Sequence, residues 1–319
     1  MGGAGHAAPF PALGDVAEDA LPTVDVPRPS RVVDGQSRVI QGLSGTRLEG
    51  ERIRGGAGLT LRNCHDLEVV GFDIAGSKFS GLSIDNCQRI RVLGGFFHDN
   101  GREKNGSPSG RIGHGIHLTG ECEDVVVAGV RCSGNFEDGV QSGNNFKGVA
   151  WLMDCGFSGN MENGADQKGG TLVHVRPDYR DNGDGRGMEA IVVHNHAAEC
   201  RVLGGRLKTK DDGAACINVS NGASVLVAGT VLDASGTKSF CVEAGKGAVL
   251  ELRHATLIGG VERPLLRVRD AKLTMDACLL HSDRSVWMKI GDEDVEKNDI
   301  LSGIQRAELI VRNCRETDP

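Results

Sequence analysis

The sequence of 319 residues predicts an all-β solenoid, in which short strands repeat along the chain and stack as successive coils. Three observations support this prediction. Short runs of alternating apolar residues return about every 23 to 25 residues, and many of these runs end in Asn-Cys or a similar pair. The composition combines 47 glycines with only 4% aromatic residues, which suits a narrow core of small and β-branched side chains between tight turns.

The bulk composition excludes two classes of partner. The net charge is −7 and no long basic run occurs, so we expect no nucleic-acid partner, because phosphate binding needs a positive surface. No apolar run approaches the length of a membrane span, so we expect no membrane insertion. The oligomeric state is not indicated by the sequence.

The ten cysteines recur in a fixed context beside Val-rich runs, as in Asn63-Cys64 and Asn86-Cys87. No CxxC pair occurs, which argues against a zinc or redox centre. We therefore interpret the cysteines as small buried thiols stacked at a repeated turn rather than as disulfides. The first residues lack the pattern of a signal peptide. As it stands the sequence suggests a cytoplasmic protein, and an extracellular or periplasmic one if a signal has been removed.

The repeats divide the chain into a leader and one domain. Residues 1–30 contain five prolines and are expected to form an extended leader, in which a short helix over residues 13–21 can cap one end of the solenoid. Residues 31–319 form the repeat domain. The charged segment 281–303 is expected to leave the coil as a loop, and residues 307–314 to form a last strand.

Two phrases offset by 25 residues locate the functional region: Asn135-Phe-Glu-Asp-Gly-Val-Gln141 and Asn160-Met-Glu-Asn-Gly-Ala-Asp-Gln-Lys168. Segments beginning at Asn100 and Asn182 fit the same frame. Because side chains alternate in and out along a strand, the frame predicts one outward column on four adjacent rungs, formed by His117, Gln141, Asp166 and Glu189. The same column continues with Ser83 on one side and with Ala215 and Cys241 on the other, so polarity is predicted to be confined to the four rungs.

This pattern resembles the right-handed parallel β-helix superfamily, the pectate-lyase-like group. The resemblance rests on the repeat length, the Asn-Cys turns and the two phrases, and covers most of the chain. It implies a single-stranded right-handed parallel β-helix of about ten rungs. The superfamily includes lyases, hydrolases, epimerases and non-catalytic fibres, so the fold alone does not assign an activity. The Asp-Asp-Cys motif of polygalacturonases is broken here by Gly213, and no Asp-Pro-His phrase of the alginate epimerases occurs.

Long loops over residues 99–113 and 176–187 are expected to wall a cleft above Gln141 and Asp166. They carry many basic residues, which favours an anionic ligand. The predicted substrate-binding residues are Gln141, Arg176, Arg186, His196 and His114.

These residues favour an enzyme that cleaves an acidic, uronic-acid-containing glycan by β-elimination. Such a reaction needs a base, an acid and a group that neutralises the carboxylate next to the proton removed. The predicted catalytic residues are Lys168 or His117 as base, Tyr179 or a histidine such as His194 as acid, and Asp166 with Glu189 in a hydrolytic variant.

Three alternatives stay open: a C5-epimerase, a glycoside hydrolase, and a non-catalytic carbohydrate-binding or structural β-helix. The reaction needs either no cofactor or Ca²⁺, for which the candidate ligands are Asp138, Glu162 and Asp166.

Overall fold

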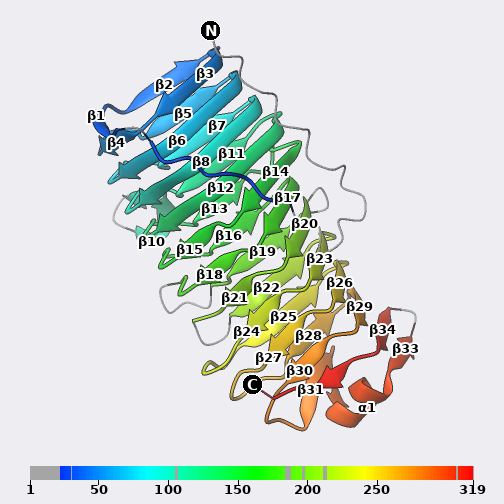
Figure 1. Ribbon diagram of the computed structural model, residues 1–319. Coiled ribbons are helices and arrows are strands. Elements are labelled where there is room, and N and C mark those ends of the chain that lie inside the picture. The colour runs from blue at the N-terminus through cyan, green and yellow to red at the C-terminus, as the bar shows by residue number, and fades with distance from the viewer. Residues whose placement is uncertain are drawn as a thin grey trace.

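The computed structural model describes residues 22–29, 31–104, 107–183, 188–195, 198–210, 214–306 and 308–318, with only the backbone described for residues 103, 104 and 107–112. The chain is almost entirely β and forms a right-handed parallel β-helix of about nine turns, which confirms the predicted fold and comes close to the predicted ten rungs. The turns stack along one axis, from β2 at one end to α1 and β33 at the other (Figure 1). No helix among the described residues has the length and apolar character that a membrane span requires.

Each turn contributes strands to three faces. Face 1 is a twelve-stranded sheet, parallel except for its last pair, β31–β32. Its strands are β2 (Arg38–Gln41), β5 (Leu59–Arg62), β7 (Leu82–Asp85), β11 (Ile116–Thr119), β13 (Val140–Ser142), β16 (Ala165–Gln167), β19 (Ile191–His194), β22 (Ala215–Ser220), β25 (Phe240–Gly245), β28 (Leu266–Arg269), β31 (Val286–Ile290) and β32 (Glu293–Glu296).

Faces 2 and 3 together form a second sheet of 21 strands, because three long strands bend and serve both faces. The long strands are β6 (His65–Ala75), β8 (Gln88–His98) and β12 (Glu123–Ser133). Face 2 continues through β3 (Ser44–Glu49), β14 (Val149–Met153), β17 (Gly170–Val175), β20 (Ala198–Leu203), β23 (Ser224–Ala228), β26 (Val249–Arg253), β29 (Lys272–Asp276), β33 (Ile304–Arg306) and β34 (Leu309–Arg312). Face 3 continues through β1 (Val33–Gly35), β4 (Glu51–Arg54), β15 (Gly156–Ser158), β18 (Asp178–Arg180), β21 (Arg206–Lys208), β24 (Val231–Asp233), β27 (Thr256–Ile258), β30 (Leu279–His281) and β35 (Arg315–Glu316).

The pairs Asn63-Cys64 and Asn86-Cys87 lie at the corner between faces 1 and 2. Asn63 and Asn86 both have φ 51°, the left-handed conformation that asparagine tolerates better than most residues. The following cysteine turns inward, where the backbone N–H of Cys64 lies 3.3 Å from Cys87 Sγ. All ten cysteines are free and buried, which confirms that they are buried thiols and not disulfides, but Cys132, Cys200, Cys216 and Cys241 lie within strands and not at a turn.

The corner between faces 3 and 1 is closed by a buried ladder of asparagines. Asn100 Nδ2 donates to Asn135 Oδ1 at 3.0 Å, Asn135 Nδ2 to Asn160 Oδ1 at 2.8 Å, and Asn160 Nδ2 to Asn182 Oδ1 at 2.8 Å. The four asparagines therefore stack as the repeat predicts. Because each asparagine lies two positions after the last residue of its face 3 strand, the ladder sets where the chain turns towards face 1 in four successive turns.

The C-terminal segment differs from the expected loop. Within residues 281–303, β31 pairs in parallel with β28 and adds one more strand to face 1, β32 folds back against it, and α1 (Lys297–Ser302) follows. The reason lies in Val286 and Trp287-Met288, an apolar group that the charged residues 292–297 obscure in the sequence; Trp287 and Met288 are fully buried. The last strand, β34, pairs with β29 as predicted.

The described part of the leader, residues 22–29, is extended and lies along the side of the coil, across β8 and β12 (Figure 1). Val24 packs against a patch of outward-facing apolar residues on face 2, and the Pro22 carbonyl accepts a hydrogen bond from Arg176 Nη2 at 3.1 Å. These residues cover a side wall rather than an end of the solenoid. The expected helix over residues 13–21 lies outside the described residues.

Candidate functional site

The outward column on face 1 forms as predicted over three turns. In the parallel pairing, His117 lies opposite Gln141 and Gln141 opposite Asp166. The fourth position is Val192, not Glu189. The step from Asp166 to Val192 is longer than the sequence frame assumes, so the prediction for Glu189 is wrong by three residues.

Glu189 belongs to a second column, at the corner just before the strands of face 1. Successive turns place His114, Asp138, Asn163 and Glu189 there, as the backbone bonds from Ile116 and its equivalents to Gly139, Gly164 and Ala190 show. The candidate site is therefore two adjacent columns, the face 1 column and this corner column.

The face 1 column continues beyond Val192 as a polar column. Asn218, Glu243, Arg267 and Lys289 follow in register, in place of the predicted Ala215 and Cys241. Polarity is thus not confined to four rungs. The predicted Ala215 and Cys241 lie three and two residues before the true positions, an error in the same direction as that for Glu189.

Asp166 is the best-connected side chain of the face 1 column. Its Oδ2 lies 2.8 Å from Lys168 Nζ and accepts a hydrogen bond from Gln141 Nε2 at 3.0 Å, while its Oδ1 lies 2.8 Å from His194 Nε2. Burial alone would raise the pKa of Asp166, but the hydrogen bond from His194 and the charge of Lys168 outweigh it and keep the pKa below its ordinary value. Asp166 is therefore a carboxylate held by three donors.

Lys168 is the partner of this carboxylate. Burial would lower its pKa, but the charge of Asp166 and the hydrogen bond to it raise the pKa above the ordinary value. Lys168 is thus a cation rather than a base, and it places a positive charge beside Gln141 and His117.

The corner column holds a buried histidine between two acidic groups. His114 Nδ1 lies 3.2 Å from Asp138 Oδ2, and its Nε2 lies 3.3 Å from Glu137 Oε2. Burial would lower the pKa of His114, but the hydrogen bond and charge of Asp138 and the charge of Glu137 raise it above the ordinary value. Asp138 itself is fully buried, and its Oδ1 accepts from Asn163 Nδ2 at 2.9 Å.

His117 lies near both His114 and Lys168, and its pKa is displaced in the opposite direction from theirs. Its ring lies 5.3 Å from the ring of His114, and no hydrogen bond joins it to any side chain or backbone group of the described residues. Burial, together with the nearby positive charges of His114 and Lys168, lowers the pKa of His117 to about 4. Its imidazole is therefore neutral at physiological pH. A side-chain carbon at Gly143 would lie 3.5 Å from His117 Nε2, so this glycine keeps the space beside the nitrogen free of side chains.

A pocket of about 340 Å³ opens at this point of the surface. It combines an exposed aromatic ring, two hydroxyl groups and three titratable side chains. Its lining residues are Phe79, Ser80, Ser83, Gly113, His114, His117 and Glu137. The pocket gives a ligand access to His117 from the side of the corner column.

Glu189 is the second unusual carboxyl group. It lies one turn beyond Asn163 in the corner column, and its Oε1 accepts a hydrogen bond from Asn218 Nδ2 at 3.0 Å. Burial raises the pKa of Glu189 to about 7, and this bond offsets the shift only in part. A proton-donating carboxyl thus lies near the ionised Asp166.

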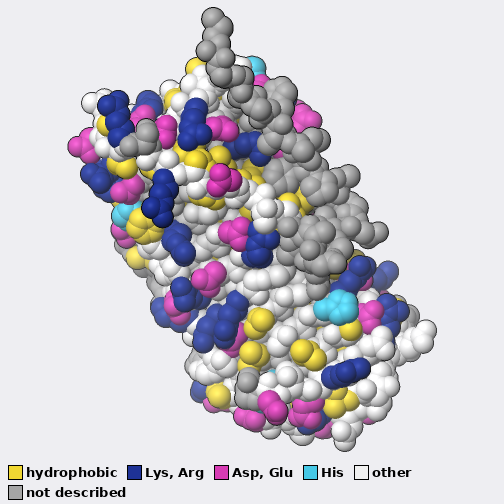
Figure 2. Space-filling view, viewed as in Figure 1, with side chains coloured by type: hydrophobic (Ala, Val, Ile, Leu, Met, Phe, Trp, Pro, Cys, Tyr) yellow, Lys and Arg dark blue, Asp and Glu magenta, His cyan; other side chains and the backbone are white. Residues whose placement is uncertain are grey.

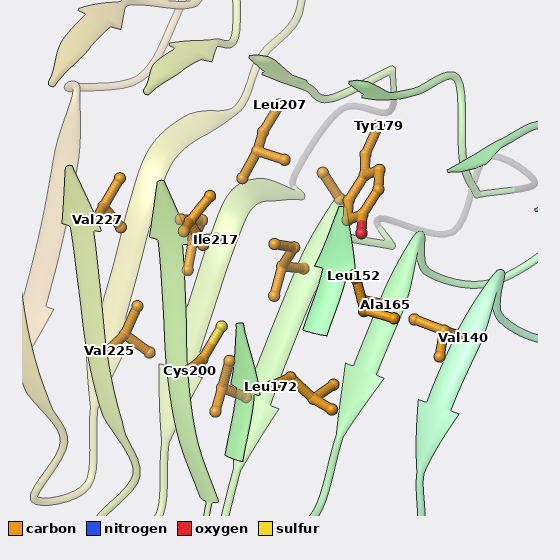
Figure 3. Close-up of a cluster of buried hydrophobic side chains, with 14 of the residues drawn as sticks. Val140, Leu152, Ala165, Leu172, Tyr179, Cys200, Leu207, Ile217, Val225 and Val227 are labelled. Atoms are coloured by element: carbon orange, nitrogen blue, oxygen red, sulfur yellow. The ribbon is translucent and has the colours of Figure 1, made fainter. Parts of the chain in front are cut away.

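The structure excludes Tyr179 from the site. It was expected on a loop, but it lies in β18, fully buried, with its ring stacked on Phe157 at 4.5 Å between centroids and its hydroxyl 2.8 Å from His174 Nδ1. In Figure 3 the ring points into the interior among residues such as Leu152 and Ala165. Burial raises the pKa of Tyr179 well above its ordinary range, so it cannot supply the catalytic proton.

Arg176 is also misplaced by the sequence prediction. It occupies the corner between faces 2 and 3 with φ 48°, and pairs with Asp154 at 2.7 Å on the far side from face 1. Segment 176–187 begins with this corner and strand β18, so only its later part can be a loop. Arg186 and His196 lie outside the described residues. The other long segment, 99–113, contains the hairpin of β9 (Arg102–Lys104) and β10 (Ser107–Ile112).

The candidate calcium ligands are engaged by protein groups. Asp138 is bound by His114, Asn163 and Gln141, and Asp166 by its three donors. Among the described residues, no group of three or more His, Cys, Asp or Glu side chains, Glu162 included, is arranged to hold a metal ion.

Sequence reasoning missed Glu137, Asn163 and Asn218. A signal for the first two existed, because Asn163 follows Asp138 by the same 25 residues that separate Gln141 and Asp166, and Glu137 adjoins Asp138 in the same phrase. The repeat that located one column could have located the other.

No protein-family model matches the sequence, and no curated protein matches it. Solved structures do resemble it. The surface adhesin PfbA of Streptococcus pneumoniae aligns with a TM-score of 0.50 at 10% identity, covering 86% of this chain and 78% of its own. The A-module of the mannuronan C-5 epimerase AlgE6 of Azotobacter vinelandii aligns with a TM-score of 0.41 at 12% identity, covering 91% and 80%, and that of AlgE4 with 0.37 at 10%, covering 81% and 85%. At these identities the likeness concerns the fold alone.

Proposed function

We propose that the protein cleaves an acidic, uronic-acid-containing glycan by β-elimination at the face 1 column and the adjacent corner column. The observation that supports this proposal is the combination of one neutral, unbonded imidazole, His117, with the cation Lys168 and with His114, whose pKa is raised by Asp138 and Glu137, beside an open pocket. Abstraction of a proton next to a carboxylate requires these elements: a base, and positive charge for the developing enolate.

In the proposed reaction, His117 removes the C5 proton of the uronate. The electron pair of the C–H bond forms the C4–C5 double bond, and the bond from C4 to the leaving oxygen breaks. Lys168 and Gln141 bind the sugar carboxylate, whose negative charge increases as the proton leaves. Bringing this carboxylate beside His117 also raises the pKa of the imidazole, which makes it a stronger base in the complex than in the free protein.

The leaving oxygen needs a proton, and the His114–Glu137 pair is its proposed source. Burial raises the pKa of Glu137, and Asp138 and Glu137 raise the pKa of His114, so both shifts favour the protonated form of the pair. Both side chains line the pocket next to His117. Asp166 and His194 act as positioning residues, because they fix Lys168 and Gln141 through hydrogen bonds and contact no substrate in this scheme.

A glycoside hydrolase is the second candidate. Asp166 and Glu189 have pKa values displaced in opposite directions, a combination typical of carboxyl pairs that divide base and acid roles. The ties of Asp166 to three donors make it the weaker candidate, because a nucleophile or base must be free to react.

Product analysis distinguishes the reactions. The protein is incubated with pectate, alginate and glycosaminoglycans, with and without calcium. Ultraviolet absorbance of an unsaturated uronate supports elimination, whereas new reducing ends without absorbance indicate hydrolysis and contradict the proposal. Exchange of solvent deuterium into an intact chain indicates epimerisation. Binding without any product indicates a non-catalytic carbohydrate-binding protein.

A further inference from the structure

A second group of charged residues lies farther along face 1, outside the proposed catalytic centre. The guanidinium carbons of Arg263 and Arg267 lie 5.0 Å and 4.6 Å from the centroid of the Phe240 ring. Phe240 and Arg267 belong to neighbouring strands β25 and β28, towards the C-terminal end of the coil (Figure 1), and Arg263 to the segment just before β28.

The two arginines differ in their partners. Arg267 forms a close ion pair with Glu243, its neighbour in the face 1 column, so its charge is compensated. Arg263 forms no ion pair with any described residue. The exposed acid beside it, Glu262, is engaged by Lys238 at 2.8 Å. The cluster therefore has one net positive charge, carried by an arginine that the Phe240 ring orients by a cation–π contact.

An oriented guanidinium without an anion is suited to bind a carboxylate or sulfate, because it offers parallel N–H donors at fixed geometry. The face 1 column connects the arginine cluster to the catalytic centre. Its residues follow one another in register as Arg267, Glu243, Asn218, Val192 and Asp166. Two further steps, through Gln141, reach His117, so six steps between parallel strands, about 29 Å, separate the two positions. Several linked sugars are needed to cover that distance.

We infer that Arg263, held on Phe240, is a subsite that binds the acidic group of a distant sugar of the same glycan whose reacting sugar lies at His117. This inference rests on the proposed function. It makes the substrate an extended acidic oligosaccharide or polysaccharide lying along face 1, and it predicts that short acidic fragments are poor ligands.

The experiment compares ligand length with the loss of this one charge. Calorimetric binding is measured for acidic octasaccharides and disaccharides derived from pectate, alginate and heparin, with wild-type protein, Arg263→Ala, Arg263→Lys and Arg269→Ala. Arg269 is the matched control, because it is an exposed arginine on β28, two residues beyond Arg267, and does not stack on Phe240. Kinetics are measured in parallel on any octasaccharide that is cleaved.

We expect Arg263→Ala to weaken binding of at least one octasaccharide about tenfold, as loss of a hydrogen-bonded charge does, and to leave disaccharide binding unchanged. Arg263→Lys should lie between, because it keeps the charge and loses the planar stacking group. For a cleaved substrate, KM should rise with little change in kcat.

Three results would overturn the inference: equal binding by wild type and Arg263→Ala at both lengths, equal losses in Arg263→Ala and Arg269→Ala, or no binding of any octasaccharide. The proposed function is tested separately. Octasaccharide binding that depends on Arg263 without formation of any product would refute the lyase and leave the subsite standing. Product formation that is insensitive to Arg263 would refute the subsite alone.

Discussion

Neighbouring titratable residues of the site have pKa values displaced in opposite directions. Asp166 is kept ionised by Lys168 and His194. Glu189, whose pKa is about 7, keeps its proton until the pH approaches that value. His114 is stabilised as a cation by two acids, while His117, only 5.3 Å away, is kept neutral. Burial of His117 favours its neutral form most, and positive charge on His114 and Lys168 adds to this effect, since a further positive charge at that point would be repelled.

The first prediction concerns His117. Replacement by alanine removes the proposed base and should lower kcat by a factor on the order of 10² to 10⁴, measured as the rate of ultraviolet absorbance on the best acidic glycan. The fold should persist, because the side chain makes no hydrogen bond to the described residues. Asn145→Ala is the control, since Asn145 is exposed nearby and should leave kcat within twofold. Unchanged turnover in His117→Ala would remove His117 from the mechanism.

Glu189 gives the second prediction, on stability. Its pKa is about 7 in the folded chain against an ordinary value of 4.5. A carboxyl group whose pKa is raised on folding contributes stability below pH 4.5, and this contribution is lost as the pH rises towards 7. The difference corresponds to about 3 kcal/mol at most.

Urea unfolding tests this at pH 5 and pH 8. The free energy of unfolding of the wild type should decrease from pH 5 to pH 8. Glu189→Gln, which still accepts the bond from Asn218, should make this decrease smaller by about 2 to 3 kcal/mol. If the variant and the wild type lose stability in parallel, then the carboxyl group titrates at an ordinary pKa and the hydrolase alternative loses its acid.

Among the structural elements, the asparagine ladder is the part that sets the site in register. Each amide both accepts and donates, so removing one member leaves two neighbours with buried, unsatisfied groups. Asn160→Ala deprives the Asn135 amide and backbone N–H of an acceptor and Asn182 of a donor. We expect a loss of about 2 to 4 kcal/mol in the free energy of unfolding.

Asn144→Ala provides the comparison, because Asn144 is exposed and its one described bond joins it to Asn195. That variant should change stability by less than about 0.5 kcal/mol. Equal effects of the two substitutions would mean that the ladder follows from the stacked strands instead of fixing them.

The strands also explain which parts of the site the sequence could predict. His117, Gln141 and Asp166 are found because each is a polar residue that follows an inward apolar residue at the same position of the repeat. The next strand, Ile191-Val192-Val193, has no alternation of polar and apolar residues, so nothing in the sequence marks Val192 as its outward residue. Glu189, three residues earlier, is polar and therefore fits the predicted column better than Val192 does. Tyr179 was recoverable, since Asp178-Tyr179-Arg180 has the polar–apolar–polar pattern of a strand with its centre inward.

At the scale of the whole molecule, one repeat accounts for the fold, because each coil buries its apolar residues only against the next. The leader and the C-terminal segment were less predictable for the same reason: neither repeats. Acidic and basic side chains are interspersed on the face seen in Figure 2, without a broad region of one sign. Binding of an acidic glycan is therefore expected from specific groups on face 1 and not from the net charge of −7.

The leader gives the last prediction. Val24 packs on an apolar patch on the outer side of face 2, and the side chain of Val26 lies where a side-chain carbon at Gly129 would meet it at 3.0 Å. That glycine has φ 62° at the bend of β12, and a side chain there would crowd Val26, so the path of the leader depends on glycine at this corner. The patch comprises Val70, Leu93, Val126, Ala128, Trp151, Met153, Val173, Val175, Leu203 and Ala228.

Deletion of residues 1–29 should lower the free energy of unfolding by on the order of 2 kcal/mol, the value of burying two valines in part. It should also expose an apolar patch large enough to promote self-association. Light scattering on a sizing column measures the second effect and urea unfolding the first. In the full chain, the double substitution Val24→Ser, Val26→Ser should reproduce part of the stability loss. Arg28→Ala should not, because Arg28 is an exposed residue of the same leader segment. Cleavage of acidic glycans should survive the deletion, because face 1 lies on another side of the coil. A truncated chain that stays monomeric and equally stable would show that the leader merely rests on the wall, and the apolar patch would then be stable in water without it.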